Sequence, residues 1–163
     1  PWGASIGLSA VGGIQPGTSS RRLNWAGPPV AVAICYELSD GNSFAQAVES
    51  GSQWLLAVAN LDPYPLSLQR QFSALAELRS IETSRDLLSV ANTGPSSLFL
   101  ATGSKQQIVP PLKEGMGVAE LHLYDQITVY TRWQEAPLVT VLFLGISGLV
   151  FSRFRSSRSL VSH

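Results

Sequence analysis

The chain has 163 residues and a mass of 17.5 kDa, which is enough for one domain with a buried core. Its formal net charge is zero and 13% of its residues are charged, which excludes the basic surface that nucleic-acid binding requires. One cysteine and two histidines, His122 and His163, exclude a disulfide within the chain and a cysteine-based zinc site. The composition therefore predicts no metal and no nucleic-acid partner.

The N-terminal segment begins at "PWGAS" without a methionine, and we interpret the chain as the C-terminal part of a longer protein. Residues 12–20, "GGIQPGTSS", are rich in glycine and serine and predict a mobile loop.

The first regular elements alternate between strand and helix. An apolar, β-branched run at residues 29–36 predicts a strand that is buried on both faces. Asp40 then caps a helix that runs through Glu49 and is ended by Gly51. A second buried strand is predicted at residues 53–60, and "LDPYP" ends it. Residues 66–84 contain neither glycine nor proline and have the length of a helix.

Further short strands follow this helix. Residues 86–92 and 96–102 predict a pair of strands around a Thr-Gly-Pro turn. Two more strands are predicted, at residues 106–109 and 117–124. This order predicts an α/β domain over residues 1–135, with helices packed on a sheet.

The helix predicted at residues 66–84 has one apolar stripe, and Arg79 lies in the middle of it. Because an unpaired buried charge is costly, Arg79 requires a partner, and Glu82 is within reach three residues later. The two residues form either a buried ion pair that braces the core or a surface pair beside a slightly misplaced stripe. The stripe consists of Leu68, Phe72, Leu75 and Ala76.

The C-terminal region combines an uncharged stretch with a basic tail. Residues 136–152 contain no charged side chain, and Arg153, Arg155 and Arg158 follow. Seventeen residues is the lower limit for crossing a bilayer core of about 30 Å, so a buried core helix is the alternative. We favour a transmembrane helix, because little chain remains to cover it and the arginines fit the positive-inside rule. The tail, residues 153–163, would then be cytoplasmic, with the preceding domain on the other side.

Cys35 lies in "VAVAICYELS", at the end of the first predicted strand. Most free cysteines are small buried hydrophobic residues. Ligand sites of open α/β sheets, however, form at the carboxyl edge of the strands, where Cys35 is expected. A thiol with a pKa of about 8.5 is only ~3% thiolate at pH 7, so a nucleophile needs a base or a cation. The local pattern leaves both interpretations open.

Three successive blocks of the sequence, of which the first contains Cys35, resemble a known family when they are taken together. They are "GPPVAVAICYELS", "WLLAVANLDPYPLSLQRQF" and "ELRSIETSRDLLSVANTGPSSLF", and they resemble blocks of the nitrilase superfamily. With the predicted terminal span, residues 28–155 are more narrowly similar to the C-terminal part of the apolipoprotein N-acyltransferase family. The resemblance implies a partial nitrilase-like α-β-β-α sandwich followed by one transmembrane helix. It places the catalytic domain on the outer face of the bacterial cytoplasmic (inner) membrane.

The resemblance also implies a reaction without a cofactor. Cys35 would attack an acyl ester of a phospholipid and hold the acyl group as a thioester. The N-terminal diacylglyceryl-cysteine of an apolipoprotein would then accept it. The family also uses a glutamate base and an oxyanion-stabilising lysine, both earlier in the chain than the nucleophile. Because Lys105 and Lys113 lie downstream, we expect the missing Glu and Lys upstream of Pro1.

Six further positions match the family as active-site support. Tyr36 and Glu37 would shape the pocket, and Asn60 matches the asparagine that ends the next strand. The remaining three match bracing positions, and for Asn92 a structural role is favoured over catalysis. The six are Tyr36, Glu37, Asn60, Arg79, Glu82 and Asn92.

The sequence departs from the family at two places. The block "PWGA" resembles a family block that ends in an active-site glutamate, but this chain has Ala4 at that position. The sequence "NLDPYP", which begins at Asn60, also differs from the usual loop of the family. Two alternatives therefore remain. One is a nitrilase-superfamily amidase, which requires residues 136–152 to be a core helix. The other is a degenerate, inactive, membrane-anchored homologue.

Overall fold

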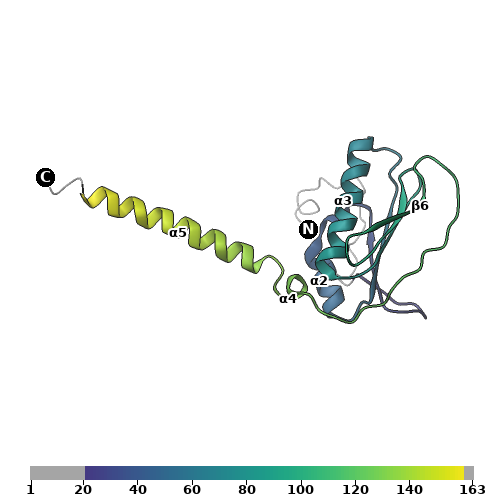
Figure 1. The fold of residues 1–163 in the computed structure, drawn as a ribbon, viewed down its shortest axis with the longest axis horizontal. Helices are drawn as coiled ribbons and strands as arrows, with labels where there is room; N and C mark the ends of the chain where they lie inside the picture. The colour runs from purple at the N-terminus through teal and green to yellow at the C-terminus, as the bar shows by residue number, and fades with distance from the viewer. Residues whose placement is uncertain (1–20, 160–163) are drawn as a thin grey trace, which may run out of the picture.

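A computed structural model describes residues 21–159, and they form one six-stranded mixed sheet, two covering helices and a long C-terminal helix (Figure 1). The strands, in their order across the sheet, are β1 (Arg22–Leu23), β2 (Val30–Ile34), β3 (Trp54–Ala59), β4 (Leu87–Ala91), β5 (Ser96–Phe99) and β6 (Lys105–Val109). The helices are the 3-10 helix η1 (Cys35–Ser39), α2 (Gly41–Glu49), α3 (Leu66–Thr83), α4 (Val129–Trp133) and α5 (Ala136–Ser159).

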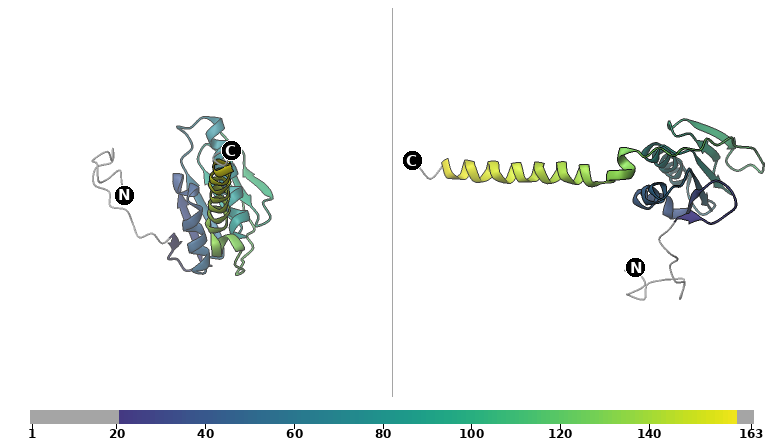
Figure 2. Two further views of the ribbon diagram at one scale, coloured as in Figure 1. Left: turned by 90° about the vertical axis from the view of Figure 1, so that its left-hand side faces the viewer. Right: turned by 90° about the horizontal axis from the view of Figure 1, so that it is seen from below.

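The centre of the sheet is parallel and its edges are antiparallel. Strands β2, β3 and β4 run parallel, whereas β1 pairs antiparallel with β2 and the β4-β5-β6 ladder is antiparallel. Parallel neighbours require crossover connections, and α2 and α3 supply them on the same face of the sheet (Figures 1 and 2). The predicted α/β arrangement is confirmed. The carboxyl ends of β2, β3 and β4 consequently meet at one edge.

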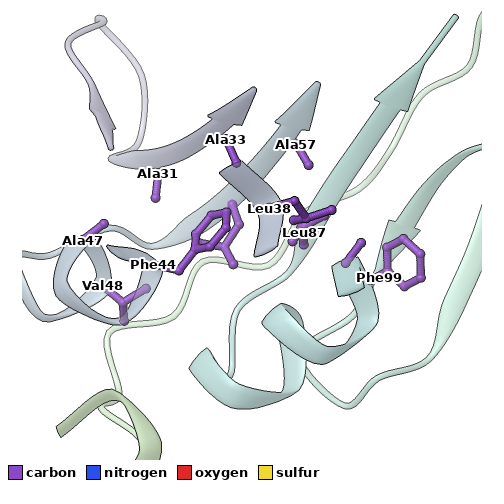
Figure 3. Packing of buried hydrophobic residues seen from close by; sticks show 11 residues of the cluster. Ala31, Ala33, Leu38, Phe44, Ala47, Val48, Ala57, Leu87 and Phe99 are labelled. Carbon is purple, nitrogen blue, oxygen red and sulfur yellow. The ribbon is translucent and has the colours of Figure 1, made fainter. Parts of the chain in front are cut away.

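The core lies between the two helices and the sheet (Figure 3). Small side chains on the strands, among them Ala31, Ala33 and Ala57, allow the helices to approach closely, and the ring of Phe44 fills the space above them. The remaining buried members of the cluster are Leu38, Ala47, Val48, Leu55, Ala76, Leu87 and Phe99.

The opposite face of the central strands carries apolar side chains but is open. Ile34 is 65% exposed, Val58 41% and Val90 39%, and each stands at a position that alternates with the buried residues of its strand. Parallel strands are ordinarily covered on both faces. This apolar open face is therefore what a second layer of structure would cover.

The junction of α3 and β4 depends on two buried charged residues. Asp86 is fully buried and accepts hydrogen bonds from the backbone N–H of Ala101 (2.8 Å) and of His122 (2.9 Å). The His122 Nδ1 atom lies 3.0 Å from the same carboxylate. The neighbouring Arg85 is 1% exposed, its Nε donates to the Ser52 carbonyl (3.0 Å), and burial lowers the pKa of its guanidinium. Asp86 thus joins three segments that are distant in the sequence.

Replacing Asp86 with Ala should lower the free energy of unfolding by about 3 kcal/mol, because two backbone N–H groups lose a charged acceptor. Urea unfolding followed by circular dichroism measures the loss. The matched control is Asp62→Ala at an exposed site, where we expect a change within about 0.5 kcal/mol. Equal stability of the two variants would contradict the role given to Asp86.

The strand predicted at residues 117–124 is wrong. This segment is extended but makes no ladder within the part of the chain that the structure describes. Its backbone instead contacts the residues that precede β3 and β4. The N–H of His122 donates to the Asp86 carboxylate, and the N–H of Tyr124 donates to the Gln53 carbonyl (3.3 Å). Periodicity in the sequence cannot distinguish this course from a paired strand.

The C-terminal helix α5 extends away from the α/β domain (Figures 1 and 2). A helix over residues 136–152 is thus confirmed, and large apolar side chains on it, such as Leu142 and Phe143, are exposed. Within residues 21–159, however, no helix combines the length and the apolar character needed to cross a membrane. The predicted transmembrane helix is therefore not borne out.

Three features of the sequence fall outside the described residues, in whole or in part. They are Ala4 with its "PWGA" block, the glycine- and serine-rich segment at residues 12–20, and residues 160–163 of the predicted tail.

Candidate active site

Cys35 occupies a sharp turn at the carboxyl end of β2. The strand ends at Ile34, two residues earlier than predicted, because Cys35 adopts a left-handed backbone conformation with φ of 53°. Such a φ is uncommon for a residue other than glycine. Residues held in sparsely populated conformations cluster at functional sites. The geometry of Cys35 thus differs from that of a cysteine that only fills a strand.

The side chain of Glu37 closes this turn. Its Oε2 atom accepts a hydrogen bond from the backbone N–H of Ile34 (2.9 Å). This bond connects the residue before Cys35 to a residue after it and so closes the turn around the thiol. Arg21 approaches the same oxygen at 3.0 Å and the Oδ2 atom of Asp40 at 3.3 Å. The guanidinium of Arg21 also lies 5.4 Å from the ring centre of Phe44. Glu37 and Arg21 together fix the path of the chain around Cys35.

Asp40 begins the helix that follows the turn. It accepts a hydrogen bond from the backbone N–H of Ser43 (3.1 Å), which confirms the predicted cap. Burial acts to raise the pKa of Asp40, but the hydrogen bonds from Ser43 and the charge of Arg21 outweigh it and hold the pKa below its ordinary value. The cap therefore favours the ionised carboxylate.

Replacing Asp40 with Ala should cost about 1 kcal/mol of stability at pH 7, because the helix loses its capping carboxylate. The lowered pKa means that the folded protein binds the Asp40 proton more weakly than the unfolded chain does. The contribution is therefore complete above about pH 4 and is lost as the pH falls through the folded-state pKa.

Urea unfolding of both proteins across pH 7 to 2.5 measures this convergence. Asp40→Asn serves as the control, since an asparagine cap should retain most of the stability at every pH. A constant difference between wild type and Asp40→Ala would contradict the prediction.

Asn60 and Asn92 follow the ends of the parallel strands β3 and β4, at the same sheet edge as Cys35. The Nδ2 atom of Asn92 donates to Oδ1 of Asn60 (2.7 Å), and the Oδ1 atom of Asn92 accepts from the N–H of Leu61 (2.9 Å). Oδ1 of Asn60 also accepts from the N–H of Asp62 (3.1 Å). These bonds use the amide groups to hold the loop that follows β3.

Arg79 and Glu82 form the buried ion pair that was one of the two alternatives from the sequence. Their side chains are 7% and 17% exposed, so the interpretation as a surface pair is wrong. Burial raises the pKa of Glu82, and the charge of Arg79 offsets this in part. The hydroxyl of Thr128 donates to the Glu82 carbonyl (2.5 Å), which brings the start of α4 to the pair. The Arg79 guanidinium lies against Gly41, the first residue of α2.

Replacing Gly41 with Ala should destabilise the protein by about 2 kcal/mol, because a Cβ there would overlap the Arg79 guanidinium and crowd the Tyr130 hydroxyl. Thermal unfolding measures the effect. Gly145→Ala in α5 is the control, since nothing in the described structure lies within 4 Å of a Cβ at that position. A Gly41→Ala variant as stable as the control would show that Arg79 is free to move.

A cavity of about 350 Å³ opens beside Cys35. Cys35 and Tyr36 form one side of it, and Tyr64 and the N-terminal half of α3 form the other. Leu68, Phe72 and Leu75 of the predicted apolar stripe point to this cavity and are only half-buried, whereas Ala76 is fully buried in the core. The predicted stripe therefore lines the cavity through three of its residues and packs in the core through the fourth.

The structure groups the predicted site residues in three places. Cys35, Tyr36 and Glu37 share the turn after β2, Asn60 pairs with Asn92, and Arg79 pairs with Glu82.

Sequence reasoning missed Arg21 and the cavity wall on α3. No sequence signal links Arg21 to Glu37, which lies 16 residues away. The wall was visible as a stripe, but periodicity alone does not tell a cavity from a core. Within residues 21–159, no three His, Cys, Asp or Glu side chains lie together as a metal site would require.

Solved structures with a similar fold define the class. The amidase from Nesterenkonia sp. matches with a TM-score of 0.52 and 20% identity, over 81% of this chain and 49% of that one. A carbon-nitrogen hydrolase from Helicobacter pylori G27 matches with a TM-score of 0.53 and 10% identity, over 61% and 43%. The Nesterenkonia enzyme is described as a member of the nitrilase superfamily. The described residues thus form part of a nitrilase-like α/β fold.

Curated sequences narrow the relationship. The apolipoprotein N-acyltransferase of Prochlorococcus marinus strain MIT 9313 is 65% identical over 96% of this chain. That of a second Prochlorococcus marinus strain is 56% identical over 85%. The chain is a homologue of apolipoprotein N-acyltransferases, and it spans 31% and 28% of the lengths of these two relatives. No family model matches the chain.

Proposed function

We propose that the chain is the C-terminal part of an apolipoprotein N-acyltransferase and that Cys35 is its nucleophile. The observation that carries the proposal is the position of the only cysteine, in a left-handed turn at the carboxyl edge of the parallel strands. The 65% identity to the enzyme of strain MIT 9313 supports the same assignment. One structure of the Nesterenkonia amidase carries acrylamide added at its active-site cysteine, which supports a cysteine nucleophile on this fold.

The proposed reaction has two acyl-transfer steps. The thiolate of Cys35 attacks the ester carbonyl of a phospholipid, a thioester forms, and the lysophospholipid leaves with the proton it needs. The amine of the diacylglyceryl-cysteine then attacks the thioester, which forms an amide and returns the thiol. The glutamate base and the oxyanion-stabilising lysine would come from the part of the parent protein outside this chain. Lys105 donates to the Ser73 hydroxyl (2.8 Å) on α3 and is not assigned that role.

The six supporting residues receive positioning roles in this proposal. Glu37 holds the nucleophile turn through its bond to the Ile34 N–H, and Tyr36 lines the cavity. The Asn60–Asn92 pair orders the loop after β3, while Arg79 and Glu82 fix the start of α2.

The open face of the sheet supports a further proposal about the parent fold. A second sheet, contributed by the rest of the parent protein, would cover Ile34, Val58 and Val90 and complete an α-β-β-α sandwich. The proposed location is the bacterial cytoplasmic membrane, with catalysis on its outer face, because the phospholipid donor and the diacylglyceryl acceptor both lie in that membrane.

A second candidate function is amide hydrolysis, since the fold of the amidase is similar and a cysteine nucleophile serves both reactions. However, α5 extends from the domain (Figure 1) and is not the core helix that this alternative requires. The two differ in the acceptor of the acyl group, which is water in one and an amine in the other. A third candidate is an inactive homologue, favoured by Ala4 and by the altered loop after Asn60.

A chimera tests the proposed function. This chain replaces the matching third of the strain MIT 9313 enzyme, in cells depleted of their own N-acyltransferase. We expect an N-acylated model lipoprotein by mass spectrometry and a hydroxylamine-sensitive acyl label on the chimera. Cys35→Ala should abolish both, because no thioester can form.

The controls distinguish the alternatives. An inactive chimera beside an active parental enzyme would support the degenerate homologue, and acyl release to water alone would support an amidase. A label that persists in Cys35→Ala would overturn the nucleophile assignment. The 163-residue chain alone is expected to be inactive.

A further inference from the structure

We propose that Arg21 is a positioning residue for the Cys35 nucleophile. It acts through Glu37 and Asp40, the two carboxylates that follow the thiol in the chain. This assignment rests on the proposed function, because it concerns the residue that would attack the acyl ester. Arg21 lies outside the three sequence blocks on which the resemblance to the family depends. Its role therefore follows from its contacts alone.

The guanidinium of Arg21 binds both carboxylates at once. Its Nη1 atom lies 3.0 Å from Oε2 of Glu37, and its Nη2 atom lies 3.3 Å from Oδ2 of Asp40. The guanidinium is planar and rigid, so its two terminal nitrogens hold the carboxylates at a fixed separation. Because Glu37 closes the turn and Asp40 caps α2, one rigid group ties together the two segments that follow the thiol.

The two carboxylates depend on this cation to stay together. The side chains of Glu37 and Asp40 are 53% and 46% exposed, and without a shared cation they would repel each other. Glu37 would then be free to turn into solvent and to release the N–H of Ile34. The left-handed conformation of Cys35, which is uncommon for residues other than glycine, would lose the bond that closes around it. The thiol would consequently leave its position at the sheet edge.

Arg21 is itself fixed at both ends. Its backbone carbonyl accepts a hydrogen bond (2.8 Å) from the N–H of Val32 on β2, the strand that leads to Cys35. Its side chain is 11% exposed, and the guanidinium lies 5.4 Å from the ring centre of Phe44, which is fully buried in the core. Rigid support of this kind holds a functional group in its productive geometry before substrate binds.

Amide hydrogen exchange on the isotope-labelled chain, followed by NMR, tests the assignment without any acyl transfer. The N–H of Ile34 reports the bond to Glu37, whereas the N–H of Val32 reports the pairing of the Arg21 backbone with β2. Arg21→Met keeps the apolar part of the side chain and removes the guanidinium. We expect exchange at Ile34 to become about tenfold faster in this variant, while exchange at Val32 changes by less than about twofold.

Two further variants separate geometry from charge and from general stability. Arg21→Lys keeps the charge, but one ammonium cannot replace a fork that reaches two carboxylates, so we expect exchange at Ile34 about fivefold faster than in the wild type. Arg22→Met is the matched control. The Nη1 atom of Arg22 donates to the Ser50 carbonyl (2.8 Å) at the C-terminal end of α2, so exchange at Ile34 should remain within about twofold.

The chimera measures the consequence for the reaction. A displaced nucleophile slows attack rather than substrate binding, so Arg21→Lys should lower kcat for acyl transfer by about tenfold and leave KM within about twofold. Arg22→Lys should leave both constants within about twofold of the unsubstituted chimera. Rates are expressed per mole of folded enzyme, which circular dichroism measures, so that a loss of folded protein does not count as a loss of kcat.

The outcomes separate this assignment from the proposed function. Unchanged exchange at Ile34 in Arg21→Met overturns it, and so does a rise that includes Val32, because β1 would then have separated as a whole. Wild-type exchange in Arg21→Lys would show that charge alone suffices and would overturn the two-point contact. A selective rise at Ile34 with an unchanged kcat also overturns the assignment. A selective rise supports it where Arg21→Lys slows the chimera, and equally where the unsubstituted chimera is inactive.

Discussion

The turn after β2 is the constraint on which the candidate site depends. A parallel strand must leave the sheet edge abruptly to reach its crossover helix, and here the reversal falls on Cys35 with a φ of 53°. The carboxylate of Glu37 holds the turn from within by accepting the Ile34 N–H, and Arg21 connects Glu37 to the helix cap at Asp40. The thiol is presented at the edge because these contacts fix the backbone around it.

Helix α3 connects this turn to the rest of the domain through two different surfaces. Its C-terminal half is buried through Ala76 and Arg79, and the Arg79–Glu82 pair lies against the start of α2. Its N-terminal half leaves Leu68 and Phe72 half-buried at the cavity beside Cys35. One helix thus supports the core and lines the cavity beside Cys35, because both lie on the same face of the sheet.

Much of the fold could be predicted because local signals agreed with the tertiary structure. The helix after Asp40, the long helix at residues 66–84 and the first two central strands have clear periodicity and end signals. The strand predicted at residues 117–124 is wrong because an extended segment and a paired strand share one sequence pattern. In the structure, the backbone N–H of His122 binds the Asp86 carboxylate rather than a neighbouring strand. A helix forms at residues 136–152, as predicted, although no helix of the described residues is long and apolar enough to cross a membrane.

The sequence by itself determined the two long crossover helices, the central strands, the single thiol at a strand end and the charged pair on the long helix. These follow from composition and from spacings of three or four residues, which fix neighbours on one helix or strand. Only the tertiary structure decided that Cys35 adopts a left-handed turn, that Arg21 reaches Glu37, that Asn92 meets Asn60 and that Leu68 faces a cavity. Each of these depends on how separate segments pack, and no local pattern records the distance between residues far apart in the chain.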